Sequence, residues 1–171
     1  MVEELQAHAP NRPRWTEIPF PPYRYVPGQS PHPRTHPEGH SYGKPEEVHP
    51  PWNPDEWKTI ERYLYGIDLY NHAYFWEAHE ALESLWRAAE PSSVKACFIQ
   101  GLIQIAAANL HRRMGHNESV LGQAEKGLSH LSTARSEGPT YMGIEIEKFS
   151  ADVRAHFTGG TSKPPLIDLI S

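Results

Sequence analysis

Three side chains capable of chemistry stand close together in the run HEALE: His79, Glu80 and Glu83, here called the histidine–glutamate cluster. If the run is helical, His79 and Glu83 are four residues apart and are neighbours on the helix surface. An imidazole and a carboxylate so placed can supply two ligands to a divalent metal, or a histidine base oriented by a carboxylate. A metal-dependent, hydrolase-like enzyme is therefore one hypothesis. The run is not the zinc-protease pattern HExxH, because a glutamate stands where the second histidine would be.

The same cluster also has an architectural explanation. The apolar residues around it recur at spacings of three and four, which places them with His79 on one stripe of a helix: Phe75, Ala78, Leu82, Leu85 and Trp86. A polar group on a buried stripe must be paired to avoid a desolvation cost, so we expect His79 and Glu83 to be largely buried and hydrogen-bonded. Arg87 stands four residues after Glu83 and is its expected ion partner. We favour this architectural interpretation.

The next predicted helix carries two further candidates. His111 falls with Gln100 and Gln104 on its polar flank, as expected for an ordinary amphipathic surface. Asn109 falls on the stripe that faces the core. A buried amide needs hydrogen-bond partners, and the histidine–glutamate cluster could supply them.

A third group of histidines lies near the N-terminus, where His32, His36 and His40 are spaced four apart in PHPRTHPEGHSYG. Three imidazoles on a flexible segment can bind zinc, nickel or copper. They could also join the cluster around Glu80 as additional ligands. The alternative, which we favour, is that these histidines bond to the body of the protein, to the backbone or to water.

The run EAHEALESLW followed by FIQGLIQIAAANLHRRMGHN resembles a family of small helical proteins, domain of unknown function 309. The matching residues lie on two successive predicted helices: Phe75, His79, Glu80, Glu83 and Trp86, then Phe98, Gly101, Leu102, Ile103, Ala106 and His111. The resemblance extends over about residues 57–131. After Gly115 the chain departs from the pattern. The resemblance implies a helical fold and no agreed activity.

The pattern of apolar residues and helix breakers predicts an all-α fold. We expect helices over about 54–70, 73–90, 94–114, 117–137 and 141–157, joined by short turns as antiparallel neighbours in a compact bundle, with no sheet. This divides the chain into an arm (1–53), a helical domain (54–158) and a C-terminal tail (159–171). The apolar end of the tail should dock on the body or on a neighbouring subunit.

Residues 1–54 contain 13 of the 17 prolines, and this density excludes regular helices in the arm. Its aromatic residues are too numerous for a solvated linker. We therefore predict an extended, proline-rich arm that lies across the helices and buries most of these rings: Trp15, Phe20, Tyr23, Tyr25 and Trp52.

Composition narrows the class of protein. A net charge of −5 argues against a nucleic-acid binder. One cysteine, Cys97, cannot form a disulfide within the chain, which is typical of a reducing cytoplasm. We expect no secretory signal and no membrane span, because no long apolar run is present.

Three functional hypotheses remain. The leading one is a non-enzymatic ligand-binding or protein-interaction module, self-associating, with an architectural histidine–glutamate cluster. The second is the metal-dependent enzyme described above, and the third is a metal-binding protein that uses the arm histidines. A divalent metal is the one cofactor that these residues suggest.

Overall fold

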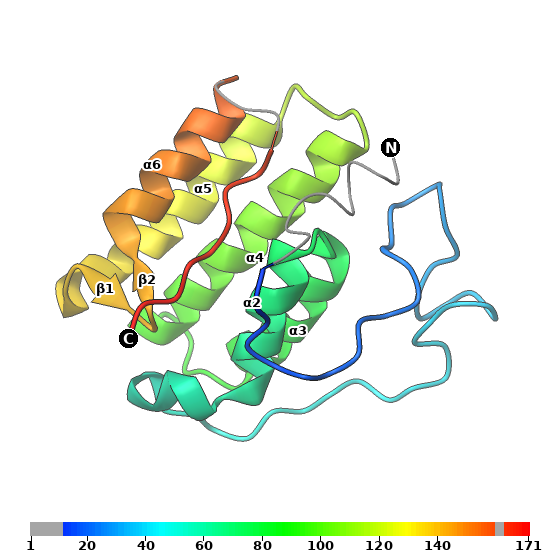
Figure 1. The fold of residues 1–171 in the computed structure, drawn as a ribbon, viewed down its shortest axis with the longest axis horizontal. Helices are drawn as coiled ribbons and strands as arrows, with labels where there is room; N and C mark the ends of the chain where they lie inside the picture. The colour runs from blue at the N-terminus through cyan, green and yellow to red at the C-terminus, as the bar shows by residue number, and fades with distance from the viewer. Residues whose placement is uncertain (1–11, 160–162) are drawn as a thin grey trace.

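The computed structural model describes residues 12–159 and 163–171, and it confirms the all-α prediction. The elements in chain order are η1 (Pro54–Thr59), α2 (Glu61–Asn71), α3 (Phe75–Arg87), α4 (Val94–Arg113), α5 (Val120–Ser132), η2 (Thr133–Glu137), β1 (Thr140–Tyr141), β2 (Ile144–Glu145) and α6 (Ile146–Phe157). The long helix α4 packs against α3 on one side and α5 on the other, while α2 packs on α3 and α6 on α5 (Figure 1).

The predicted helices form because their apolar residues face this shared core. Phe98, Ile99 and Ile105 of α4 are fully buried, as are the aromatic rings of Tyr63 in α2 and Phe75 in α3. The expected caps are present: the Asn53 side chain accepts the Asp55 amide at 3.1 Å, and Ser93 accepts the Ala96 amide at 3.2 Å. Gly115 ends α4 with a φ of 84°.

Several boundaries differ from the prediction. Helix α5 begins at Val120 instead of about residue 117, and α6 begins at Ile146 instead of about residue 141. The first helix breaks at Ile60, so a 3₁₀ turn precedes α2. The signature helix α3 ends at Arg87, because the amides of Ala88 and Ala89 turn back to carbonyls three residues earlier. The fourth predicted helix tightens into the 3₁₀ segment η2 after Ser132.

The expectation of no sheet is wrong in one short region. Strands β1 and β2 pair antiparallel around Met142 and Gly143, which have φ values of 46° and 81°. Two successive positive φ angles suit a two-residue hairpin turn. The turn is fixed from the core side, because the buried Tyr63 hydroxyl donates to the Met142 carbonyl at 2.8 Å.

The C-terminal tail docks on the body. Its red trace crosses the bundle in Figure 1. The side chain of buried Asn71 pairs with both backbone groups of Ile167, donating at 2.9 Å and accepting at 2.8 Å, and the Ile170 amide donates to the Gly143 carbonyl at 2.8 Å.

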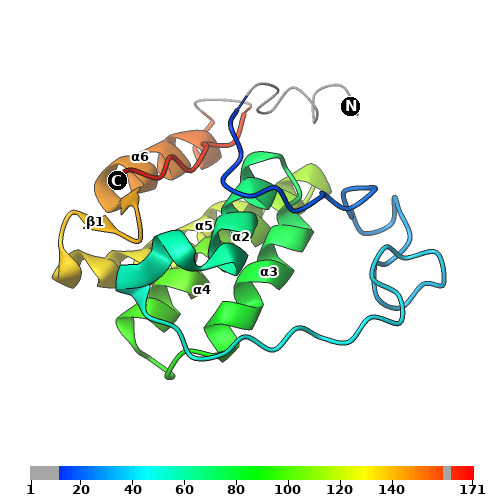
Figure 2. The same ribbon diagram turned by 60° about the horizontal axis from the view of Figure 1, so that its bottom comes forward.

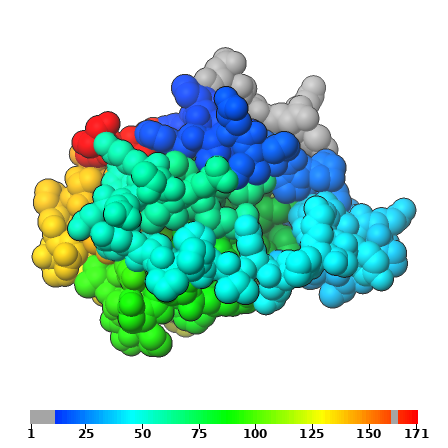
Figure 3. Space-filling view, turned by 90° about the horizontal axis from the view of Figure 1, so that it is seen from below, coloured from blue at the N-terminus to red at the C-terminus, as the bar shows by residue number. Residues whose placement is uncertain are grey.

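The arm, described from residue 12, lies against the helices, as Figure 3 shows in blue to cyan, and loops out beside α3 (Figure 2). Tyr25 and Trp52 are buried, and the Trp52 indole donates to the Leu85 carbonyl at 2.9 Å. Phe20 and Tyr23 are half-buried. The expectation is wrong for Trp15, which is 45% exposed although its ring packs edge-on against Trp57.

Two glycines set the separation of α4 and α5. A Cβ at Gly101 would lie 2.7 Å from the Gly127 carbonyl oxygen, and one at Gly127 would lie 3.0 Å from the Gly101 carbonyl oxygen. The two helices therefore touch backbone to backbone at this crossing, and neither position has room for a side chain.

Substituting Gly101→Ala should lower the free energy of unfolding by about 1–3 kcal/mol, because a backbone carbonyl must move to admit the methyl group. Gly122→Ala is the matched control on the exposed side of α5, where no atom lies within 4 Å of the added Cβ. It should stabilise the protein by about 0.5–1 kcal/mol through helix propensity. Urea unfolding measures both, and equal effects of the two substitutions would contradict the close crossing.

Candidate functional site

The histidine–glutamate cluster lies on α3 at the edge of its buried face. The side chains of His79, Glu80 and Glu83 are 33%, 23% and 25% exposed, so His79 and Glu83 are largely buried, as expected, but neither is fully buried. Compared with the predicted stripe, the buried face of α3 is rotated so that it includes Glu77 and Ser84, because α2 and the arm cover that side. Trp86, predicted on the buried stripe, is exposed for the same reason.

The cluster is held by arginines. His79 Nδ1 lies 3.7 Å from Glu80 and Nε2 lies 3.6 Å from Glu83, which is too far for direct hydrogen bonds. The second oxygen of Glu80 accepts from Arg34 at 3.1 Å, and that of Glu83 from Arg87 at 3.0 Å. The predicted ion pair of Glu83 with Arg87 is therefore present, and Arg34 ties the cluster to the arm.

The cluster retains the atoms that a metal would need. One ligand atom from each of its three residues lies within 4.8 Å of the others, and in residues 12–159 and 163–171 this is the one such group. An open hollow of about 350 Å³ reaches His79, with His111 and the Trp76 ring among its walls. His111 itself lies 2.8 Å from the Gln123 side chain of α5, an interaction that its place on a polar flank did not predict.

The arm histidines do not join this cluster. His32 packs edge-on against Trp76, and its Nδ1 accepts the backbone amides of Arg34 and Thr35 at 3.2 and 3.3 Å. Exposed His36 accepts the Glu38 amide at 3.1 Å. The histidines thus bond mainly to the arm itself.

His40 pairs instead with Glu77, a residue that the sequence reasoning missed. His40 Nε2 lies 3.0 Å from Glu77 Oε1, and both side chains are 5% exposed. The Tyr25 amide donates to the same oxygen at 2.8 Å. Glu77 Oε2 is buried and has no hydrogen-bond partner among the residues that the structure describes. The small residues Ala81 and Ser84, which follow Glu77 at spacings of four and seven, were the signal that this side of α3 is covered.

Asp68 of α2 is a second buried carboxylate that holds the arm. It is 2% exposed and accepts the amides of Trp15 and Thr16 at 2.9 Å each, and the Thr16 hydroxyl at 2.8 Å. Arg14 lies 3.7 Å from the same carboxylate. The sequence analysis did not identify Asp68. This residue lies within a predicted helix, and no local pattern indicates that its carboxylate accepts hydrogen bonds from a segment 52 residues away.

Asn109 is buried as expected but has other partners than expected. Its amide donates to the Tyr70 hydroxyl at 3.4 Å and to the Ile105 carbonyl at 3.1 Å, and neither His79 nor Glu83 contacts it. Burial raises the pKa of Tyr70, so this hydroxyl stays protonated. Asn109 therefore belongs to the packing of α4 on α2.

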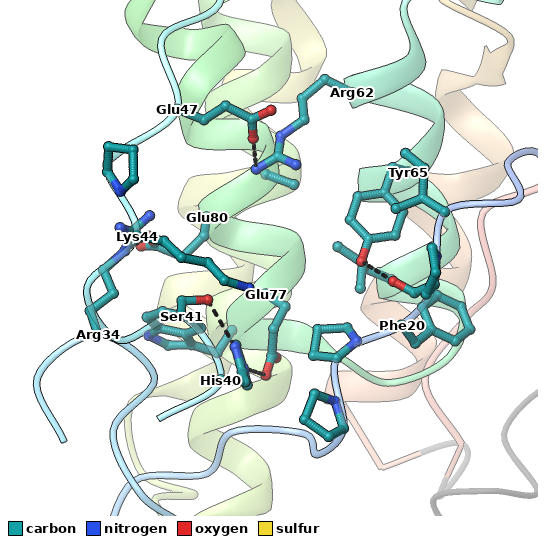
Figure 4. Close-up of a pocket in the computed structure, with 18 residues that line it drawn as sticks. Phe20, Arg34, His40, Ser41, Lys44, Glu47, Arg62, Tyr65, Glu77 and Glu80 are labelled. Atoms are coloured by element: carbon teal, nitrogen blue, oxygen red, sulfur yellow. Dashed lines mark hydrogen bonds and ion pairs between the residues drawn. The ribbon is translucent and has the colours of Figure 1, made fainter. Parts of the chain in front are cut away.

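Where the arm passes α2 and α3, it leaves an open cleft of about 540 Å³. Its apolar walls are Phe20, Tyr65, Trp76 and several arm prolines. Figure 4 shows the arm residues Arg34, Ser41 and Lys44 on one side, and Glu77 and Glu80 of α3 facing them. The Tyr65 hydroxyl fixes one edge by donating to the Pro19 carbonyl at 3.0 Å. The size and mixed lining are those of a small-molecule site.

The fold and these sites define a small helical bundle with an attached arm. Residues 63–122 match the family model described as "Domain of unknown function (DUF309)", which supports the resemblance that the sequence suggested. The matched segment includes α3, α4 and the histidine–glutamate cluster, but not the arm. A search of the curated proteins gives no match. None of the helices in the described ranges combines the length and apolar character that a membrane crossing needs.

Replacing Asp68 by Asn should lower the free energy of unfolding by about 2–3 kcal/mol, because the backbone amide of Trp15 or Thr16 then faces an NH₂ group instead of a carboxylate oxygen. Thr16→Val is the matched control. It removes only the hydroxyl contact and should cost about 1 kcal/mol. Limited proteolysis reports whether the arm has come loose. Wild-type stability and protease resistance in Asp68→Asn would show that this carboxylate does not hold the arm.

Proposed function

We propose that this protein is a non-enzymatic ligand-binding module whose site is the cleft between the arm and helices α2 and α3. The single observation that carries the proposal is the cleft itself. It is a concave space of about 540 Å³ with aromatic and proline walls, into which charged groups converge from three segments of the chain. Most sites for small molecules combine these features.

The way the arm is held supports the proposal. The walls of the cleft belong to segments far apart in sequence. Hydrogen bonds fix these segments relative to each other, as between Tyr25 and Glu77 and between Tyr65 and Pro19. A site held in this way is formed before the ligand arrives, so binding does not have to order the arm. On this proposal the histidine–glutamate cluster is architectural, and its Arg34–Glu80 pair connects arm and helix at the rim.

The test is a thermal-shift screen of small charged metabolites, followed by calorimetric titration of the hits. Arg62, half-buried at the cleft wall, pairs with Glu47 and lines the site. Arg62→Gln should weaken hits by about tenfold, the effect of losing a charge-assisted contact. Lys126→Gln, on the exposed surface of α5, is the control and should change nothing. A screen without hits, or hits indifferent to Arg62→Gln, would reject the cleft as the site.

A metal centre at the histidine–glutamate cluster is the second candidate, favoured by its three ligand atoms within 4.8 Å and the hollow beside His79. Against it, each carboxylate already shares one oxygen with an arginine, and that positive charge disfavours a dication. Among the described residues no arm histidine adds a ligand to this group.

If the cluster is architectural, untagged protein dialysed against zinc or manganese should retain far less than one ion per chain in elemental analysis. His79→Ala should then cost less than about 1 kcal/mol of stability, because its ion pairs are partly solvated. Stoichiometric metal that disappears in Glu83→Gln would instead establish the metal site and favour the enzyme hypothesis.

Self-association, the absence of nucleic-acid and membrane partners, and a cytoplasmic location stay predictions from the sequence. Exposed apolar side chains such as Trp86 and Leu121 support self-association.

A further inference from the structure

We infer that the hollow beside His79 is a second binding site, and that its ligand is an uncharged heteroaromatic molecule. The ligand donates an N–H group to His111 and accepts one from His32. This site goes beyond the proposed function and does not depend on it. Among the described residues, Trp76 is the one side chain that lines both the hollow and the cleft.

The walls of the hollow favour an uncharged ligand. The volume of about 350 Å³ suits a small molecule. No Asp, Glu, Lys or Arg is among the described residues that line it, so a charged group would lose water there without gaining an ion partner. Besides three histidines, the walls are rings and aliphatic groups of the arm, α3 and α4: Tyr25, Pro27, Phe75, Trp76, Ala107 and Leu110.

Ring contacts fix the aromatic walls. The Trp76 ring of α3 packs edge-on against Tyr25 of the arm, with centroids 5.3 Å apart and an interplanar angle of 82°. It packs in the same way against His32, at 5.7 Å and 77°, and the rings of Tyr25 and His32 meet at 5.1 Å. Since each ring holds the other two in place, the walls against which a flat ligand would lie are formed in advance.

His32 offers a hydrogen-bond donor. Its Nδ1 accepts the backbone amides of Arg34 and Thr35 at 3.2 and 3.3 Å, so the ring proton is on Nε2. Nε2 makes no hydrogen bond with the described residues, and it is not among their unpaired atoms that are closed to solvent. This N–H group is therefore accessible and lacks an acceptor, which a ligand can supply.

His111 offers an acceptor. Its Nδ1 lies 2.8 Å from Gln123 Oε1, and because a carbonyl oxygen only accepts, Nδ1 must donate. In the neutral imidazole Nε2 then carries a lone pair, and this atom is also unpaired in the described chain and open to solvent. Gln123 belongs to α5, which packs on the opposite side of α4 from α3 (Figure 1). The His111 ring therefore presents Nε2 away from α5, on the side of the hollow.

Together the two imidazoles specify the ligand. A hydrocarbon that filled the hollow would cover both nitrogens and leave them without a partner, which is unfavourable. A flat ring that carries one N–H group and one acceptor atom satisfies both and can still lie against the aromatic walls. Azoles and cyclic amides have this chemistry.

Three probes of similar size test the inference in calorimetric titrations of the full chain. Benzimidazole has a donor and an acceptor, 1-methylbenzimidazole lacks the donor, and indole lacks the acceptor. The titrations are made at about pH 8, where an ordinary imidazole is neutral, with a chelator present so that no metal takes part. Benzimidazole should bind about three- to tenfold more tightly than either relative, which is the effect of one hydrogen bond. Equal binding of the three probes, or no binding of any, would overturn the inference.

Two substitutions assign the contacts. Asparagine keeps a polar atom near the position of Nδ1 and deletes Nε2, so His32→Asn retains the acceptor for the arm amides and His111→Asn retains the donor to Gln123. His32→Asn should abolish the preference for benzimidazole over indole, and His111→Asn the preference over 1-methylbenzimidazole. His130→Asn is the matched control, because His130 Nδ1 lies 2.9 Å from Gln104 Oε1 and the residue does not line the hollow. An unchanged preference in both hollow variants would reject the assignment.

NMR of the histidine rings gives a readout that needs no ligand. It should place the ring proton on Nε2 of His32 and on Nδ1 of His111, and the opposite tautomers would contradict the inference. Arg62→Gln, which tests the cleft, should leave the affinity for benzimidazole unchanged. Hits that depend on Arg62, without binding of benzimidazole, would therefore overturn this inference alone. Benzimidazole binding with the expected preferences, in a protein whose cleft yields no hits, would support it and reject only the proposed function.

Discussion

The structure depends on two buried carboxylates that accept backbone amides of the arm. Asp68 of α2 binds the amides of Trp15 and Thr16, and Glu77 of α3 binds that of Tyr25. The described part of the arm forms no helix or strand before Pro54, so its amides cannot be satisfied by regular secondary structure. Removing either acceptor would leave buried donors unpaired, which is costly in free energy. These contacts therefore decide that a proline-rich segment of low helical propensity is part of the folded body.

The functional proposal follows from the same constraint. An arm fixed to α2 at Thr16 and to α3 at Tyr25 must pass from one helix to the other, and the space that it does not fill is the cleft. The charged residues that line the cleft also come from both segments. Arg34 and Lys44 belong to the arm, whereas Glu77 and Glu80 belong to α3. The family match covers residues 63–122 and so lies outside the arm. The matched segment supplies one wall of the proposed site, and the arm supplies the other.

The helices were predictable because their apolar residues repeat with the period of an α-helix and their caps are local. Asn53, Ser93 and Gly115 act where the sequence indicated. The hairpin at Met142 was not predictable, since strands of two residues carry no alternating pattern and depend on contacts with Tyr63.

The site was harder to predict than the fold. Periodicity gives the direction of a stripe only to within about one residue position, which is 100° on a helix. An error of this size in the predicted direction of the buried face explains why His79 lies at the edge of that face and Glu77 lies within it. The pairing of Glu83 with Arg87 was found because it is local. The partners of Asp68 and Glu77 were not, because they lie 52 residues away in a segment without periodicity.

Amide hydrogen exchange measured by NMR tests the central claim most directly. In the folded protein the amides of Thr16 and Tyr25 should exchange as slowly as core amides of α4, because they donate to buried carboxylates. Val48, an arm residue that is 89% exposed, is the internal control and should exchange rapidly. Exchange of Thr16 and Tyr25 at the rate of Val48 would contradict the account, because the arm would then not be held by Asp68 and Glu77.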